Sequence, residues 1–134
     1  MNMQHTTALK IVLGLAGLLV IIPGVMALFN PTGFTARNGA EIGEMVSVLN
    51  DYRGLGAWML GSGVVMLLGI LHRRMAFTST VVAILTHLGL SLGRLISLAA
   101  DGMPAKGLIA ATVVEGVVGL LAVFALMRFR EKDE

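Results

Sequence analysis

Four long apolar runs constrain this chain most, because each is long enough for a helix that crosses a bilayer. They cover residues 11–29, 55–71, 77–100 and 108–127. A helix over the first run would be about 28 Å long, close to the roughly 30 Å of hydrocarbon in a membrane. Only 13% of the 134 residues are charged, whereas about 25% is usual in soluble domains. The sequence therefore predicts an all-α integral membrane four-helix bundle that forms a single domain over residues 1–134.

The ends of the runs carry recognisable stop signals. The second run stops at His72-Arg73-Arg74, and an amphipathic stretch near 41–48 precedes it. The third stops before Gly102, which can take the positive φ of a helix C-cap, and Pro104, which cannot continue a helix. The first run also resembles a secretory signal peptide, with 25–27 as a possible cleavage site, and this alternative competes with a retained span.

Basic residues are distributed unevenly between the two sides of the predicted bundle. One side carries Lys10, Arg73, Arg74, Arg128, Arg130 and Lys132, and the other carries Arg37, Arg53 and Lys106. Cytoplasmic loops of membrane proteins are enriched in Lys and Arg. We therefore expect both termini in the cytoplasm, an N-in/C-in topology, with the loops over 30–53 and 101–106 on the outer side.

Small residues at helical spacings predict close approach of the helices within the bundle or between copies of the chain. These residues are Gly14, Gly17 and Gly24 in the first span, Ala57 and Gly61 in the second, and Thr112, Gly116 and Gly119 in the fourth. Tyr52 and Trp58 fall near the outer boundary, where aromatic rings commonly anchor membrane proteins.

Two charged residues lie inside the apolar runs, Arg94 in the third and Glu115 in the fourth. An unpaired charge in hydrocarbon is destabilising by at least about 2.5 kcal/mol, so each needs a partner. Each lies seven residues from the outer end of its run, and both are therefore about 10 Å below the outer boundary. Equal depth on consecutive antiparallel helices predicts an Arg94–Glu115 ion pair, with Arg53 or Asp101 completing a network.

A polar stripe along the third span indicates where a ligand could bind. His87, Ser91, Arg94 and Asp101 follow helical spacing, and Pro23 should bend the outer half of the first span. We expect a cavity bounded by spans one, three and four, with Arg94 as the anchor, Asp101 and Arg53 at the entrance, and His87 at the floor. The alternative is purely structural, with the charged residues holding the helices in register.

Several classes of function are disfavoured. The absence of cysteine removes disulfides and thiolate sites, and the small charge excess without a basic patch argues against nucleic-acid partners. His72 and His87 differ in depth by about 15 Å, so they cannot bind one haem. No two histidines lie at helical spacing, and the Gly-x-Ser-x-Gly pattern at 89–93 falls inside the expected third span, whereas a hydrolase elbow needs a strand-to-helix turn. We expect no cofactor and no enzymatic activity.

Two stretches and Glu115 resemble a known family. The stretches are 50–56, Asn-Asp-Tyr-Arg-Gly-Leu-Gly, and 93–104, Gly-Arg-Leu-Ile-Ser-Leu-Ala-Ala-Asp-Gly-Met-Pro. Together they resemble the bacterial domain-of-unknown-function family 4345, small four-helix inner-membrane proteins. The resemblance implies a multi-pass protein of the bacterial inner membrane and brings no activity with it.

The sequence favours a non-catalytic role. We expect either binding of a lipid-like or small amphiphilic ligand in the outer half, or service as an accessory subunit of a larger membrane complex. The alternative is a small oligomeric transporter in which Glu115 exchanges protons with substrate. Membrane lipids are the expected partners. Further expected partners are a second copy of the chain, in a homo-oligomer, or the subunits of a larger membrane complex.

Overall fold

The computed structural model describes residues 3–130 and confirms an all-α fold built on four long helices. These are α1 (Thr7–Phe29), α3 (Val46–Leu71), α4 (Ala76–Asp101) and α5 (Lys106–Phe129). A short helix, α2 (Pro31–Arg37), follows α1, and a single 3-10 turn, η1 (Arg73–Met75), precedes α4. All four long helices have the length and hydropathy needed to cross a membrane. They correspond to the four predicted spans.

The helix boundaries follow from local sequence. Thr6 caps α1, because its side chain accepts a hydrogen bond from the Leu9 amide at 3.2 Å. α4 ends at Gly102, whose φ of 96° is the positive value predicted for it. α3 begins at Val46, nine residues before the apolar run over 55–71, because its first turns contain polar residues and so lie outside that run.

The sequence analysis did not anticipate α2, which lies within the predicted outer loop. Asn30 caps it, because its side-chain oxygen accepts a hydrogen bond from the Gly33 amide at 3.0 Å. Pro31 at the first helical position has the φ angle that a helix start requires. This Asn-Pro start is the local signal from which α2 could have been predicted.

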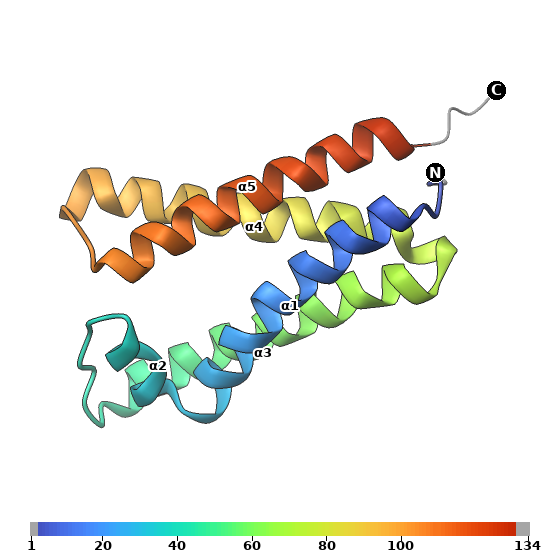
Figure 1. Cartoon of the computed structure of the whole chain (residues 1–134). Coiled ribbons are helices and arrows are strands. Elements are labelled where there is room, and N and C mark those ends of the chain that lie inside the picture. Colours follow the sequence, from blue (N-terminus) through green and yellow to red (C-terminus); the bar gives the residue numbers. More distant parts are fainter. Residues whose placement is uncertain (1–2, 131–134) are drawn as a thin grey trace.

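The four long helices form two antiparallel pairs, α1 with α3 and α4 with α5 (Figure 1). Both chain ends lie at one end of the bundle, which we call the terminal end, and α2 lies at the other, the α2 end (Figure 1). The terminal end is held together by a backbone hydrogen bond from the Gln4 amide to the Phe129 carbonyl at 2.7 Å. An isolated antiparallel bridge between Met3 and Arg130 adds to this closure.

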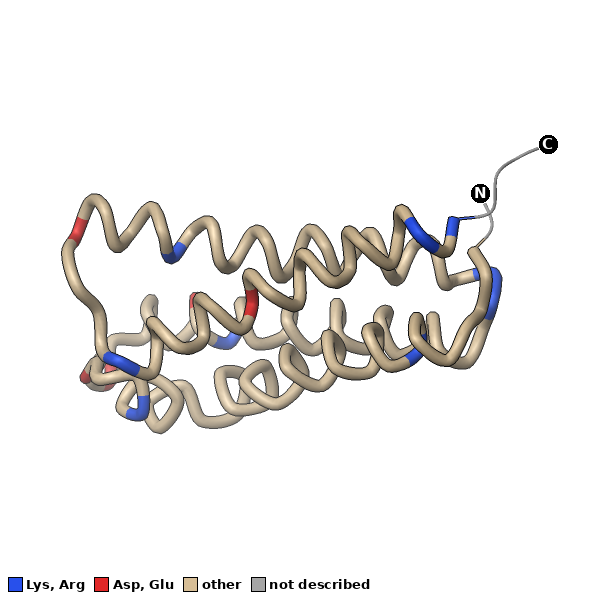
Figure 2. Tube along the Cα trace, turned by 45° about the horizontal axis from the view of Figure 1, so that its top comes forward, with Lys and Arg blue, Asp and Glu red and all other residues tan. Residues whose placement is uncertain are grey.

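Charged residues concentrate at the two ends of the bundle, with few between them (Figure 2). Lys and Arg dominate the terminal end, whereas both signs of charge occur at the α2 end (Figure 2). Lys132, which the charge count included, lies outside the described residues. The separation is the pattern expected of a bundle whose middle lies in hydrocarbon.

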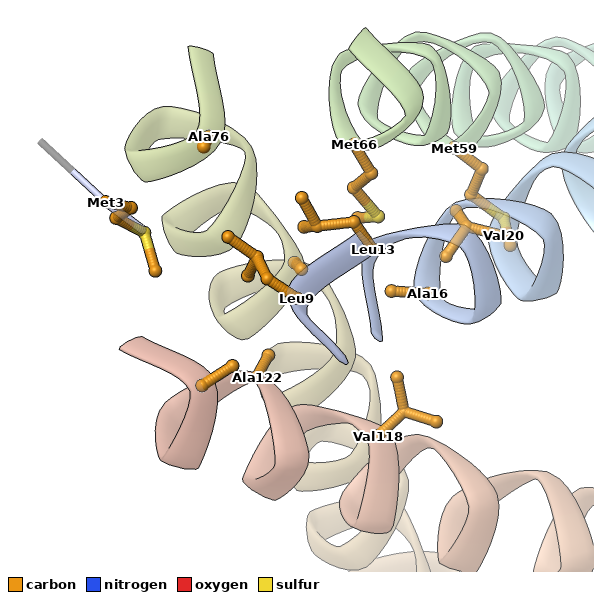
Figure 3. Close-up of a cluster of buried hydrophobic side chains, with 12 residues drawn as sticks. Met3, Leu9, Leu13, Ala16, Val20, Met59, Met66, Ala76, Val118 and Ala122 are labelled. Atoms are coloured by element: carbon orange, nitrogen blue, oxygen red, sulfur yellow. The ribbon is translucent and has the colours of Figure 1, made fainter. Parts of the chain in front are cut away.

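The buried core lies mainly toward the terminal end, where all four long helices contribute to it (Figure 3). Its fully buried members include Met3, Leu9, Leu13, Met66 and Ala122. Outward-facing apolar side chains such as Ile22 and Phe124 are by contrast largely exposed. This is the distribution expected where lipid is the surrounding solvent, because an apolar side chain loses nothing by facing hydrocarbon.

The tightest helix contact is between α1 and α3, and glycines make it possible. A methyl group on Gly24 would lie 3.1 Å from the Gly56 carbonyl oxygen, and one on Gly17 would lie 3.1 Å from that of Gly63. The prediction of close approach within the bundle is confirmed for Gly17 and Gly24 on α1, whereas Ala57 and Gly61 on α3 do not contribute to packing within the chain. Those two residues are exposed, and nothing lies within 4 Å of a methyl group placed on Gly61.

Candidate functional site

The predicted ion pair is present in the half of the bundle nearest α2. Arg94 Nη2 lies 3.2 Å from Glu115 Oε1, and the two side chains are 28% and 14% exposed. Arg94 belongs to α4 and Glu115 to α5, the helices that the depth argument placed side by side. Geometry thus confirms the reasoning from equal depth.

Contacts between α4 and α5 fix the register that brings the two charges together. Ser91 donates a hydrogen bond from Oγ to the Thr112 carbonyl at 3.1 Å. A methyl group on Gly116 would lie 3.2 Å from the same hydroxyl, and the Leu88 side chain occupies the space beside Gly119. Because Gly116 and Gly119 have no side chains, α5 approaches α4 closely on the face that carries Glu115.

A cavity of about 540 Å³ lies beside the ion pair. Its apolar and polar lining comes from all four long helices, from α2 and from the loop that follows α2. The lining residues are Leu19, Pro23, Phe34, Thr35, Asn38, Ala40, Tyr52, Leu55, Met59, Leu90, Arg94, Leu108, Ala110, Ala111, Val114 and Glu115. Its volume falls in the range of about 300–1,000 Å³ that is usual for small-molecule sites.

The cavity is not sealed from its surroundings. Leu19 on α1 and Val114 on α5 both line it and are 41% and 43% exposed. Both residues lie within the membrane-compatible parts of their helices. Part of the cavity lining is therefore exposed at helix positions that can lie in the hydrocarbon.

Arg94 and Glu115 are the only charged side chains in that lining, and their hydrogen-bonding capacity is not fully used. Arg94 Nη1 and Glu115 Oε2 are buried and have no hydrogen-bond partner among the described residues. Buried polar atoms are normally satisfied, since each unsatisfied one is destabilising by about 1–3 kcal/mol or more. The pair thus has one free donor and one free acceptor beside a mostly apolar space.

Four of the six residues predicted for the site do not line the cavity. His87 is fully buried, and its Nε2 donates to the Ala16 carbonyl at 3.0 Å, so it joins α4 to α1 instead of forming the floor. Ser91 joins α4 to α5, as described above. The expected polar stripe therefore divides into separate contacts, because α4 meets different neighbours along its length.

Arg53 and Asp101, which we expected at the entrance, are not among the residues that line the cavity. Arg53 Nη1 donates to the Leu28 carbonyl at 2.6 Å, and this contact joins the start of α3 to the end of α1. Asp101 Oδ2 accepts a hydrogen bond from Ser97 Oγ at 2.8 Å on its own helix. Both residues have nearby partners of their own, so neither extends the Arg94–Glu115 pair into a network.

Sequence reasoning missed the contribution of α2 and of the start of α3. Phe34 and Tyr52 contact each other edge to face, with ring centroids 6.2 Å apart, and both line the cavity. Tyr52 was predicted as a boundary anchor, whereas the structure places its half-buried ring against α2. The amphipathic stretch before the second run was the available signal, but it does not indicate which helix the ring contacts.

Fold and site define a class, a multi-pass membrane protein whose four apolar helices enclose a charged pair beside an apolar cavity. The chain matches the family described as "Domain of unknown function (DUF4345)" over residues 8–126. It belongs to this family, as the resemblance predicted. No match was found among curated proteins or among solved structures.

Proposed function

We propose that this protein is a non-catalytic binding protein for an amphiphilic molecule, which it holds in the α2 half of the bundle. One observation carries the proposal, namely that a cavity of about 540 Å³ combines apolar walls with a single Arg94–Glu115 pair. Apolar walls with a few polar groups are the usual composition of a small-molecule site. The walls would bind the ligand's apolar body, and the pair would bind its head group.

The surrounding lipid is the proposed source of the ligand. Leu19 and Val114 line the cavity and are partly exposed at helix positions that can lie in the hydrocarbon, so a molecule dissolved in the bilayer could reach the cavity without passing through water. Such a molecule would be concentrated by its partition into the membrane before it binds. This argument favours a lipid-like ligand over a water-soluble one.

A matched pair of substitutions tests whether the cavity is the binding site. Ala111→Phe should reduce binding of a photoactivatable long-chain alcohol by at least about tenfold, because the added ring occupies space along the lining. Ala57→Phe places the same ring on an exposed position of α3 outside the cavity and should leave binding unchanged. Labelling in lipid nanodiscs, followed by mass spectrometry, measures both. Equal labelling of both variants would place the ligand elsewhere.

The proposed location is the bacterial inner membrane, with both termini in the cytoplasm. The described basic residues support this orientation, since Lys10, Arg73, Arg74, Arg128 and Arg130 lie toward the terminal end, against Arg37, Arg53 and Lys106 near the α2 end. Under this orientation the cavity lies in the outer half of the bilayer.

Reporter fusions test the orientation. A reporter active only in the cytoplasm should be active when fused to either terminus and inactive when inserted in the loop over 38–45. The expected difference is nearly all or none, because a reporter resides on one side of the membrane only. Activity of a periplasmic reporter at the C-terminus would reverse the proposed orientation.

A small oligomeric proton-coupled transporter is the second candidate, favoured by the position of Glu115 on the cavity. A single membrane carboxylate can couple proton and substrate movement when both compete for it. Proton release on ligand addition to reconstituted vesicles, absent in Glu115→Gln, would favour transport over simple binding. The uneven distribution of basic residues argues against the dual-topology arrangement of some small exporters.

A further inference from the structure

We infer that the cavity selects an uncharged amphiphile whose head group both donates and accepts a hydrogen bond, such as a hydroxyl, a carboxamide or an un-ionised carboxylic acid. The inference rests on the proposed function and specifies its ligand class. Two independent features of the Arg94–Glu115 pair support it, its net charge and its unused hydrogen-bonding atoms.

The charge of the pair disfavours an ionic head group. Arg94 and Glu115 are the only charged residues among those that line the cavity, and they neutralise each other at 3.2 Å. An anion beside Arg94 would also lie close to the Glu115 carboxylate, and a cation beside Glu115 would lie close to the guanidinium. In a site of low polarity such like-charge contacts are strongly unfavourable.

The unused atoms favour a head group with both a donor and an acceptor. Guanidinium groups only donate hydrogen bonds and ionised carboxylates only accept them. Arg94 Nη1 therefore needs an acceptor and Glu115 Oε2 needs a donor, and both flank the same ion-pair contact. A hydroxyl supplies both from one atom, and a carboxamide or un-ionised carboxylic acid supplies them from adjacent atoms.

Reaching these atoms requires the two side chains to rotate. Nη1 and Oε2 are covered, while the Arg94 side chain as a whole is 28% exposed and lines the cavity together with Glu115. A rotation of the two side chains within their contact would turn the unused atoms toward a head group. The free energy gained on binding would include the hydrogen bonds that the unliganded pair lacks.

A zwitterionic head group could also bring opposite charges to the pair, but the structure argues against it. Two further charges would have to leave water for a site whose walls are mainly apolar, and each such transfer is unfavourable by several kcal/mol. A hydroxyl satisfies the same two atoms with a much smaller desolvation penalty. The zwitterion is therefore a necessary competitor in the test.

The experiment uses the full chain in lipid nanodiscs and a photoactivatable dodecanol as the probe. Competitors share the dodecyl chain and differ only in head group: dodecanol, dodecyl methyl ether, dodecyl sulfate, dodecyltrimethylammonium and dodecylphosphocholine. The amount of each competitor is expressed as its mole fraction in the bilayer, so that differences in partition do not contribute. Dodecanol should displace the probe at a mole fraction about tenfold lower than any other competitor, the ratio expected from one hydrogen bond to a charged group.

Charge variants sharpen the test. Glu115→Gln leaves Arg94 as a net positive charge and should move the preference toward dodecyl sulfate, whereas Arg94→Gln should move it toward dodecyltrimethylammonium. Asp101→Asn removes a charge outside the cavity and should leave the order of competitors unchanged. The wild-type series decides the question even if a variant fails to fold.

The outcomes separate this inference from the proposed function. Saturable labelling of cavity residues that dodecyl sulfate, dodecyltrimethylammonium or dodecylphosphocholine displaces best would overturn the inference and leave the binding function standing. Displacement by the methyl ether as effective as that by dodecanol would likewise exclude a required donor. Labelling that no competitor displaces, or that falls outside the cavity, would reject the proposed function itself.

Discussion

Replacing Arg94 by methionine should destabilise the folded protein by about 3 kcal/mol, because Glu115 would be left as an unpaired charge among apolar residues. Breaking a buried ion pair from one side is generally unfavourable by about 3–5 kcal/mol. The lower value is expected here, since Arg94 is 28% exposed and Glu115 14% exposed. Glu115→Met should have a similar effect, because it leaves the guanidinium unpaired. Reversible unfolding in mixed detergent micelles measures these changes.

The double variant provides the control. Arg94→Met combined with Glu115→Met removes both charges together and should recover most of the lost stability, since an apolar pair of similar volume replaces an ion pair that is not fully hydrogen-bonded. If the double variant is instead as unstable as the sum of the single variants, the two residues do not act as a pair. Unchanged stability in both single variants would show that water screens the charges.

Gly56→Ala should destabilise the bundle by about 3 kcal/mol, at the upper end of what overpacking usually causes. The added methyl group would lie 2.7 Å from the Gly24 carbonyl oxygen and 2.9 Å from the Ala27 carbonyl carbon. These are backbone atoms, which cannot rotate away, so α1 and α3 would have to separate along their length. The same unfolding measurement detects the change.

Gly61→Ala is the matched control on the same helix. Nothing lies within 4 Å of the methyl group it would add. Alanine is the better helix former, so stability should be unchanged or greater by up to about 1 kcal/mol. A loss in Gly61→Ala equal to that in Gly56→Ala would mean that close packing against α1 is not the cause.

The sequence was sufficient for the four helices and for the ion pair. Hydrocarbon thickness sets a minimum length for a membrane-spanning helix, and uncharged runs such as 11–29 reach that length. They could therefore be assigned as spans from the sequence. Arg94 and Glu115 could be paired because hairpin connectivity fixes the depth of each residue on neighbouring helices. Both inferences depend on one dimension only, the distance along the membrane normal.

Rotation of each helix about its axis could not be predicted in the same way. Gly56 and Gly63 lie on the face of α3 that meets α1, whereas Ala57 and Gly61 lie on exposed faces. Small residues occur on several faces of α3, and in a lipid environment no polar face distinguishes inside from outside. The sequence therefore identified small residues on α3 but did not show which of them face α1.

The surroundings of the cavity were unpredictable for a different reason. Arg53 and Asp101 were assigned to it because of their depth, but each has a nearer partner, in Leu28 and Ser97 respectively. The Asn30-Pro31 start signals the helix α2, but seven residues form too short a pattern to show that α2 packs beside the cavity. Its Phe34 ring reaches the cavity through contacts that are distant in sequence.

The backbone hydrogen bond between Gln4 and Phe129 joins the two helix pairs at the terminal end, where the turn η1 also connects α3 to α4. With the chain ends tied together, the two helix pairs share a pivot at the terminal end, and the cavity lies far from it. α5 contains 24 residues and is about 36 Å long, so a relative tilt of about 5° at the pivot displaces the far tips by about 3 Å. A width change of that size at the α2 end would change the width of the cavity while leaving the contacts of Met3 and Leu9 almost unmoved. The size of this displacement follows from helix length, which the thickness of the bilayer sets.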